Sequence, residues 1–288
     1  MPPKDPHEIE ALYRGHPLNA TSILERAVAC ATACDRRLRE SDLALDPQFA
    51  LTDQNHIGGL ESTMLLAQLV EVSSQDRVLD LGCGLGGSCR VLAAEFGCST
   101  HGIDLNANRI ADARRLTDET GLRGLATFSV ADATLATTFE RFSLVWCQNS
   151  AIHMGAPTDV CRVLAEYLSR GARAAFEEVC TLRATSGISE DRLLQELGQL
   201  WGGYIYPLEQ WRLDLNRIPG AASLIEVDTQ LTVRYLTSMA EISHASSRWP
   251  ADERRGLGVG RELAASGLLG YFRATVRYEL SSAPRRQK

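Results

Sequence analysis

Long apolar runs are absent from this sequence of 288 residues. No stretch approaches the roughly 20 apolar residues that a membrane-spanning helix needs. The first residues, MPPKDPHEIEALYRG, are polar and lack the apolar core of a signal peptide. We therefore expect a cytoplasmic protein without membrane contact.

An excess of positive charge is lacking as well. Lysine and arginine together number 30, against 36 aspartate and glutamate residues, so the formal net charge is −6. Because the phosphates of nucleic acids bind cationic surfaces, this balance predicts no nucleic-acid partner.

The eight cysteines form no CxxC motif. The closest pairs, Cys30 with Cys34 and Cys83 with Cys89, have no second pair at the spacing of a zinc site. We therefore predict reduced thiols and no metal, with a thiolate site for an arsenical or a metal as the alternative.

The sequence has the composition of a folded globular protein, with 44% hydrophobic and 23% charged residues. From Thr21 the apolar residues repeat on one helix face, and Ser22 is placed to cap the start. Gly58 and Gly59 precede a second helical stretch, and adjacent glycines there indicate a hinge or a close approach to a ligand. We expect residues 1–72 to form a helical N-terminal cap and residues 73–288 to form the main domain.

Short apolar runs alternate with helical stretches beyond Arg77. The runs typical of strands are Val78–Leu81, Ser99–Asp104, Thr127–Val130, Ser143–Cys147 and Arg173–Glu177. The helical stretches between them are Ser88–Phe96, Asn106–Thr120 and Thr158–Ser169. This alternation predicts an α/β fold with a parallel sheet and helices on both of its faces.

The pattern changes after Val179. Helical pieces at Ser189–Leu200 and Leu208–Asn216 indicate a cap insertion near residues 185–218. Strands are expected at Ser223–Asp228 and Tyr271–Leu280, and turns at Pro219–Gly220 and Gly256–Gly260.

The most informative segment is the glycine-rich loop that follows the first strand. Gly82, Gly84 and Gly87 satisfy the spacing of a dinucleotide loop, which is a weak signal alone. Asp80, two residues before Gly82, would repel a pyrophosphate but would suit a ligand that carries an ammonium group.

Two further carboxylates close the next strands. Asp104 is placed to accept both hydroxyls of a ribose, and Asp132 to accept from an adenine amino group. Helix capping is the alternative for Asp104, and a plain loop acid is the alternative for Asp132. Together the three acids describe a nucleoside with a cationic tail.

At this point the chain resembles the class I S-adenosylmethionine-dependent methyltransferases. Within them it is similar to the small-molecule group that includes sarcosine/dimethylglycine and ubiquinone-type methyltransferases. The elements that carry the resemblance are DLGCGLGG, GIDL, ADA and SLVWCQNSAIHM, in this order, between about Gln54 and Val179.

The resemblance implies a Rossmann-like, seven-stranded, mostly parallel sheet. It also implies S-adenosyl-L-methionine as donor, S-adenosyl-L-homocysteine as product and a small-molecule acceptor in secondary metabolism. The residues expected to bind the cofactor are Asp80, Gly82, Gly84, Asp104, Leu105, Asp132, Ala133 and Gln148. A homodimer is left open.

An oxygen or carbon nucleophile needs a base, whereas a deprotonated amine needs none. His153 follows the fourth strand and is the first candidate; Glu177 of the pair Glu177–Glu178 is the second. His56 could close over the site from the glycine hinge, and His244 could line the acceptor pocket. For each of these residues a purely structural role is the alternative.

Four aromatic residues gather in the insertion, and they either wall the acceptor pocket or pack helices on the sheet. They are Trp201, Tyr204, Tyr206 and Trp211. The function that this sequence supports is methyl transfer to an oxygen, nitrogen or carbon of a small molecule. The alternatives are a non-methylating cyclisation or rearrangement on the same fold, a nicotinamide-dependent oxidoreductase and a non-catalytic partner subunit.

Overall fold

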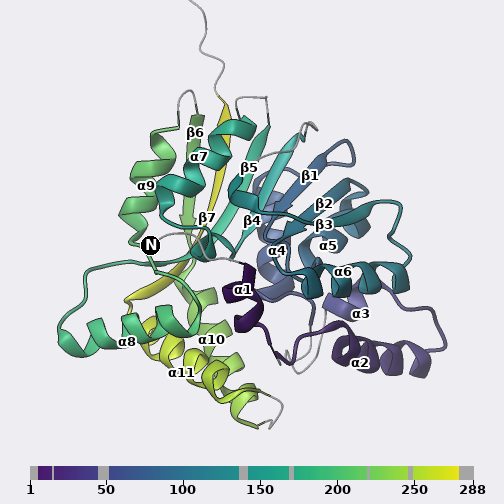
Figure 1. Cartoon of the computed structure of the whole chain (residues 1–288), viewed down its shortest axis with the longest axis horizontal. Helices are drawn as coiled ribbons and strands as arrows, with labels where there is room; N and C mark the ends of the chain where they lie inside the picture. Colours follow the sequence, from purple (N-terminus) through teal and green to yellow (C-terminus); the bar gives the residue numbers. More distant parts are fainter. Residues whose placement is uncertain are drawn as a thin grey trace, which may run out of the picture.

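A computed structural model of the chain describes residues 6–14, 16–44, 52–135, 142–168, 172–218, 221–245 and 249–278. A seven-stranded sheet in the order β3-β2-β1-β4-β5-β7-β6 forms its centre (Figure 1). The strands are β1 (Arg77–Leu81), β2 (Ser99–Asp104), β3 (Ala126–Val130), β4 (Leu144–Gln148), β5 (Arg173–Thr181), β6 (Ala221–Val227) and β7 (Leu269–Tyr278). Strand β7 runs antiparallel to β5 and β6, and the other pairs are parallel. The predicted fold class, a Rossmann-like and mostly parallel sheet with helices on both faces, is therefore confirmed.

Helices cover both faces of this sheet, and strand β4 is accordingly buried along its whole length. One face carries α4 (Gly59–Leu69), α5 (Gly87–Phe96) and α6 (Ala107–Glu119). The other face carries α7 (Pro157–Leu168) and α9 (Leu208–Asn216), whose apolar side chains pack on β5 and β7. Two short 3-10 turns, η1 (Ala133–Leu135) and η2 (Ala151–His153), follow β3 and β4.

The remaining helices gather beyond one end of the sheet. They are α1 (Pro6–Leu12), α2 (Ala20–Ala33), α3 (Glu40–Ala44), α8 (Ile188–Leu200), α10 (Thr229–Ala245) and α11 (Ala251–Ala265). In Figure 1, α8, α10 and α11 form one group, α2 and α3 form another, and α1 lies between the two groups. A second apolar core joins α2, α8, α10 and α11 to the sheet. The division at residue 72 stays a prediction, but α4, which precedes that point, packs on the sheet itself.

Helix α11 corrects one feature of the sequence interpretation. Gly256–Gly260 lies inside α11 and forms no turn. A Cβ at Gly256 or at Gly260 would come within 3.0 Å of the Trp201 indole, so these glycines make room for that ring. The glycines therefore serve helix packing, which their sequence cluster did not distinguish from a turn. The turn expected at Pro219–Gly220 lies outside the described residues.

The start of α2 is a further correction. Asn19, in an extended conformation, caps this helix by accepting a hydrogen bond from the backbone N–H of Ser22 at 3.0 Å. Ser22 is therefore the third residue of the helix and not its cap. Within the part of the chain that the structure describes, no helix is both long and apolar enough to cross a membrane.

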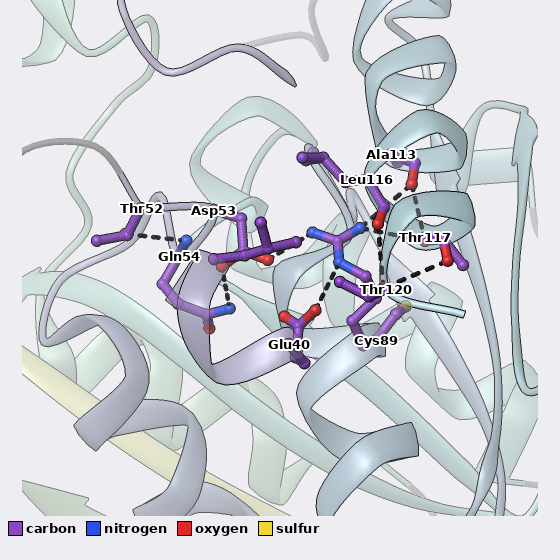
Figure 2. Close-up of polar contacts among 12 residues, drawn as sticks. Glu40, Thr52, Asp53, Gln54, Cys89, Ala113, Leu116, Thr117 and Thr120 are labelled. Carbon is purple, nitrogen blue, oxygen red and sulfur yellow. Dashed lines mark hydrogen bonds and ion pairs between the residues drawn. The ribbon is translucent and has the colours of Figure 1, made fainter. Parts of the chain in front are cut away.

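A buried arginine fastens the N-terminal segment to the sheet. Arg90 of α5 donates to the carboxylates of Glu40, at 3.0 Å, and of Asp53, at 2.5 Å. It also donates to the Ala113 carbonyl and to the Thr117 hydroxyl on α6. Figure 2 shows these acceptors converging from three separate segments of the chain. Because Asp53 also lines the cavity described next, this cluster helps to shape the site.

Candidate functional site

A cavity opens at the carboxyl ends of β1, β2, β3 and β4. Ligands of open α/β sheets bind at this edge. The cavity is lined by all eight residues that the sequence proposed for the cofactor: Asp80, Gly82, Gly84, Asp104, Leu105, Asp132, Ala133 and Gln148. The structure therefore brings this predicted set together in one place.

The glycine loop forms the floor of this cavity. Gly84 has a φ of +52°, which side-chain-bearing residues rarely adopt, and a Cβ there would meet no described atom within 4 Å. Its N–H donates to Oδ2 of Asp104 at 2.8 Å. Gly87 lets the segment that contains Asp53 pack closely against the loop, since a Cβ at Gly87 would come within 2.4 Å of the Asp53 carbonyl oxygen. The loop thus leaves open space at Gly84 and accepts a packed segment at Gly87.

Asp80 lies near the end of β1 and is only 3% exposed. Burial raises the pKa of its carboxyl to about 7, while the hydrogen bond from the Cys89 thiol lowers it and the nearby Asp104 raises it. No ion pair joins Asp80 to a cation among the described residues. A buried carboxylate in this state would gain from a cationic ligand.

Asp104 sits at the tip of β2 and holds two backbone N–H groups. Its Oδ2 accepts from Gly84 and its Oδ1 from Asn106, each at 2.8 Å. Asn106, and not Asp104, caps α6, because its side chain accepts from Asn108 and Arg109. The capping alternative for Asp104 is therefore wrong. Burial raises the pKa of Asp104, and the two N–H donors oppose that rise.

Asp132 follows β3 and is half-buried at the cavity wall. Its Oδ1 accepts from the backbone and the hydroxyl of Thr134, at 2.8 and 2.7 Å. These bonds fix the carboxylate at the start of η1. A carboxylate oxygen accepts more than one hydrogen bond, so Asp132 keeps acceptor capacity toward the cavity.

Gln148 ends β4 and connects the cavity to a buried polar network. Its Oε1 accepts from Thr63, Ser88 and Trp146, at 3.2, 2.8 and 3.2 Å. Its Nε2 donates to Oε2 of Glu177 at 2.5 Å. The side chain is therefore held rigidly from below.

Glu177 lies behind Gln148 and does not line this cavity. It is also absent from the lining of a second, neighbouring cavity that is described below. Its carboxylate is fully buried and accepts from Ser62 Oγ and Arg273 Nε, each at 2.8 Å. Burial raises the pKa of Glu177 to about 7, and Arg273 opposes the rise. The structure thus separates Glu177 from the space in which a substrate would react.

Glu178 points to the opposite face of β5, and it is buried too. It accepts from the backbone N–H of Ile152 at 2.9 Å, at the start of η2. We expected only one member of the Glu177–Glu178 pair to be buried. Both are buried, because helices cover both faces of the sheet at this point.

His56 lines the cavity from the segment before α4. Its Nε2 lies 3.0 Å from the Gly59 carbonyl oxygen, which can only accept, so Nε2 carries a proton. Burial lowers the pKa of this imidazole to about 4. His56 is therefore neutral near pH 7 and is a weak base.

His153, the last residue of η2, is half-buried and lines the same cavity. Its Nδ1 lies 3.2 Å from the Gly202 carbonyl oxygen and donates to it. In a neutral ring this donation makes Nε2 the basic nitrogen. Of the three predicted catalytic residues, His153 therefore has the geometry of a base at the cavity wall.

The other residues that the sequence suggested for the acceptor pocket lie in different parts of the molecule. Exposed His244 lies near the end of α10, where Nδ1 contacts its own helix at Ala240, and it lines neither the cofactor cavity nor the cavity beside it. Trp211 packs against Phe176 and Phe272 in the core of the sheet. Of the four insertion aromatics, Trp201 lines a second cavity.

That cavity lies next to the first. The two share their lining at Tyr13, Asn55, His56, Asn149 and His153, a set that we call the junction. The rest of the second cavity is lined by residues of α1, η2, α8, α10 and α11 and of the segments next to them.

Sequence reasoning missed three junction residues, Tyr13, Asn55 and Asn149. Asn149 directly follows β4, and its place at a strand end is a signal that could have revealed it. Tyr13 comes from the N-terminal segment, where no local pattern marks a ligand contact. Within the described residues, no group of three or more histidine, cysteine or acidic side chains is placed to hold a metal ion.

The segment that carries most of this site is similar in sequence to known methyltransferases. Residues 78–171 match a family model described as a methyltransferase domain. The curated Methyltransferase GfsG of Streptomyces halstedii is 32% identical over 122 residues, which are 42% of this chain and 44% of that protein. The chain therefore spans less than half the length of this curated relative.

Solved structures resemble the chain over a greater length. A putative sarcosine dimethylglycine methyltransferase from Galdieria sulphuraria superposes with a TM-score of 0.66 and 19% identity, over 76% of this chain and 86% of that one. The [4+2]-cyclase SpnF superposes with a TM-score of 0.67 and 20% identity, over 98% of this chain and 99% of that one. At these identities the likeness establishes a shared fold.

Proposed function

Because residues 78–171 match a methyltransferase domain, we propose that the chain is a class I S-adenosylmethionine-dependent methyltransferase that methylates a small-molecule acceptor, with S-adenosyl-L-methionine as donor. One observation carries the proposal. Asp80, Asp104 and Asp132, at the ends of three successive strands, line one cavity that shares a wall with a second cavity. Two adjoining spaces are what a donor and an acceptor require.

The residues present fit this cofactor. Asp80 is a buried carboxylate that would gain from the ammonium group of the methionine moiety. Gly84 leaves a space that any Cβ would fill. Asp104 would hold the ribose hydroxyls and Asp132 the adenine amino group, since each keeps lone pairs beyond its backbone bonds. Leu105, Ala133 and Gln148 would complete the walls.

When bound, the cofactor supplies an electrophilic methyl group on a positively charged sulfur, and S-adenosyl-L-homocysteine remains after transfer. The chain contributes alignment and exclusion of water, which in model systems are worth about 7–11 kcal/mol. For an oxygen acceptor, the His153 imidazole receives the proton at Nε2 while Gly202 holds the ring at Nδ1.

We assign His56 and Glu177 supporting roles. Neutral His56 forms part of the junction wall, and its lowered pKa makes it a poor proton acceptor near pH 7. Glu177 positions Gln148 and lacks the contact with an acceptor that a catalytic residue needs.

Titration calorimetry tests the proposal directly. S-adenosyl-L-homocysteine should bind wild-type protein at micromolar strength, and Asp104→Ala should weaken binding at least tenfold. Asp118→Ala removes an exposed carboxylate near the end of α6, the helix that follows Asp104. This variant should bind S-adenosyl-L-homocysteine as the wild type does. Absence of binding to the wild type would refute the proposal.

A non-methylating cyclisation is the second candidate, because SpnF, a cyclase by name, matches almost the whole chain in fold. The two functions differ in product mass. Transfer adds one methylene per turnover and consumes the cofactor, whereas cyclisation leaves both the substrate mass and the cofactor unchanged.

A cytoplasmic location and a place in secondary metabolism complete the proposal. The eight cysteines are free thiols in the structure, which suits a reducing compartment. Fractionation of the producing cells tests the location. Sedimentation tests the homodimer that the sequence left open, and a filter-binding assay should detect no nucleic-acid partner.

A further inference from the structure

We infer that the second cavity binds the acceptor, and that this acceptor is an amine whose ammonium group is held by the Glu253 carboxylate. This acceptor class rests on the proposed methyl transfer and deepens it. The features that point to an amine are the position of the cavity, its one acid, the lack of a cation beside that acid, and its aromatic walls.

The second cavity lies where an acceptor must lie. It adjoins the cofactor cavity, and the two share the five junction residues. A molecule in the second cavity therefore reaches the cofactor through the junction. Because methyl transfer requires donor and acceptor to be held side by side, this position suits the acceptor.

Glu253 is the one acidic residue in the described lining of the second cavity. It lies in the first turn of α11, and 27% of its side chain is exposed, so a ligand in the cavity can reach it. Burial raises the pKa of this carboxyl, and the charge of Arg109 opposes the rise. A partly buried carboxylate of this kind gains free energy when an ammonium group binds to it.

No lysine or arginine of the described chain pairs with this carboxylate. The described lining of the cavity contains neither residue type. The guanidinium of Arg109 lies over the Tyr13 ring, 4.0 Å from its centroid, and its Nη1 donates to the Leu18 carbonyl oxygen. Its Nη2 contacts no described acceptor, so the charge of Arg109 acts on Glu253 without an ion pair between them.

His16 contacts Glu253 as an uncharged donor. The Leu18 N–H donates to His16 Nδ1 at 3.1 Å, which leaves the ring proton on Nε2, and Nε2 lies 3.4 Å from Oε1 of Glu253. Burial and the charge of Arg109 lower the pKa of His16 to about 3, so the ring is neutral near pH 7. Within the described chain, no residue donates to the other oxygen of Glu253, which is therefore open to a ligand.

Aromatic rings lie close to this acid. His16, which contacts Glu253, packs edge-to-face with Trp249 and with Tyr13, at 5.7 and 5.8 Å between ring centroids. The faces of aromatic rings attract ammonium groups, whereas they offer nothing to a carboxylate or a phosphate. The walls and the acid thus favour the same charge. The aromatic residues of the described lining, histidines aside, are Tyr13, Trp201, Tyr235 and Trp249.

The junction offers a further hydrogen-bond acceptor. The side-chain oxygen of Asn149 is buried and accepts from no described residue. It would accept from an N–H or an O–H alike, so the preference for a cation comes from Glu253. Both of these open atoms are acceptors, and an ammonium group carries three donors and no acceptor.

Three probes that share a phenyl ring test the acceptor class. They are 2-phenylethylamine, 2-phenylethanol and 3-phenylpropanoate, which are cationic, neutral and anionic at pH 7. Each is titrated calorimetrically into the full chain with S-adenosyl-L-homocysteine present. We expect the amine to bind at least tenfold more tightly than the alcohol or the carboxylate. Equal or weaker binding of the amine, or no binding at all, would overturn the inference.

Glu253→Gln locates this preference. The substitution keeps the size of the side chain and removes its charge, so the amine and the alcohol should then bind within about threefold of each other. Glu262→Gln is the matched control, because Glu262 is an exposed glutamate of the same helix outside the cavity lining, and it should keep the tenfold preference. If Glu253→Gln keeps the preference, or if both variants lose it equally, the inference fails.

Titration of S-adenosyl-L-homocysteine alone separates this inference from the proposed function. Glu253 does not line the cofactor cavity, so Glu253→Gln should bind S-adenosyl-L-homocysteine as the wild type does, which also shows that the variant is folded. Failure of the wild type to bind S-adenosyl-L-homocysteine refutes the donor site and the proposed function. Binding of S-adenosyl-L-homocysteine without a preference for the amine refutes only the acceptor class.

Discussion

Arg90 Nη2 and Asp53 Oδ2 are 2.5 Å apart, and neither side chain is accessible to solvent. The pair joins α5, which begins in the glycine loop, to the segment that bears His56 and leads into α4. Glu40 adds a second buried carboxylate to the same guanidinium. One cation therefore compensates two acids at the place where the N-terminal segment meets the cofactor cavity.

Replacing that cation should destabilise the protein strongly. Arg90→Met leaves Asp53 and Glu40 buried without the cation that they share, and we expect a loss of about 3–5 kcal/mol in the free energy of unfolding. Chemical denaturation measures it. Arg123→Met removes an exposed arginine paired with Asp118 and should change stability little, because water and salt screen such surface pairs. Similar losses in the two variants would contradict the role given to Arg90.

Cofactor affinity should rise as the pH increases from 5.5 to 7. Because burial raises the pKa of Asp80 to about 7, the carboxyl is mostly protonated at pH 5.5 and half ionised at pH 7. Only the ionised form attracts an ammonium group, so S-adenosyl-L-homocysteine should bind on the order of tenfold more tightly at pH 7.

Calorimetry across this pH range measures the effect. Asp80→Asn should bind more weakly at pH 7 and should show a nearly flat profile. Asp104 also has a raised pKa, and any slope that persists in Asp80→Asn reports on it. An unchanged slope in that variant would disprove the role of Asp80.

Gly84→Ala should impair cofactor binding more than folding. The added methyl group would enter the cavity, and the φ of +52° would cost about 1–2 kcal/mol of stability. Gly121→Ala is a matched control, because Gly121 has a φ of +75°, no described atom near a Cβ and no place in the cofactor cavity. Both variants should lose similar stability, and only Gly84→Ala should bind S-adenosyl-L-homocysteine at least tenfold more weakly.

Glu177→Gln should act on stability before activity. Arg273 would lose its closest buried counter-ion and keep only Asp228, at 3.4 Å, so we expect a loss of about 3 kcal/mol. Exposed Glu226→Gln on β6 should change stability by under about 0.5 kcal/mol. If Glu177→Gln kept wild-type stability and abolished turnover, Glu177 would be catalytic after all.

The sheet and the cofactor cavity could be predicted from the sequence because both depend on local patterns. The strand ends that carry Asp80 and Asp104 are marked by apolar runs and by their distance from the glycines, and parallel strands bring such ends to one edge. Even the strand limits differ from the structure by only a few residues.

The acceptor side was less accessible, because it depends on contacts between distant segments. Gly256 and Gly260 have the composition of a turn, and only the Trp201 indole explains their place in a helix. The sequence suggests the Glu177 carboxyl as a base. Only the structure shows that Arg273, almost 100 residues later in the chain, donates a hydrogen bond to it. The contribution of Tyr13 to the junction likewise has no local signature.

Strand β7 lies between β5 and β6, although it is the last described strand in the sequence. On the ribosome, β5 must therefore wait with an open edge, and β6 has no described strand to pair with until residues 269–278 have emerged. Open strand edges invite aggregation, so this interval is the hazardous one in biosynthesis. Arg273 arrives with β7 as well, so Glu177 gains its counter-ion only in that final step. A nascent chain that stops before β7 would thus have an incomplete sheet and would be prone to aggregate. Chaperones should therefore bind the chain mainly at this stage of synthesis.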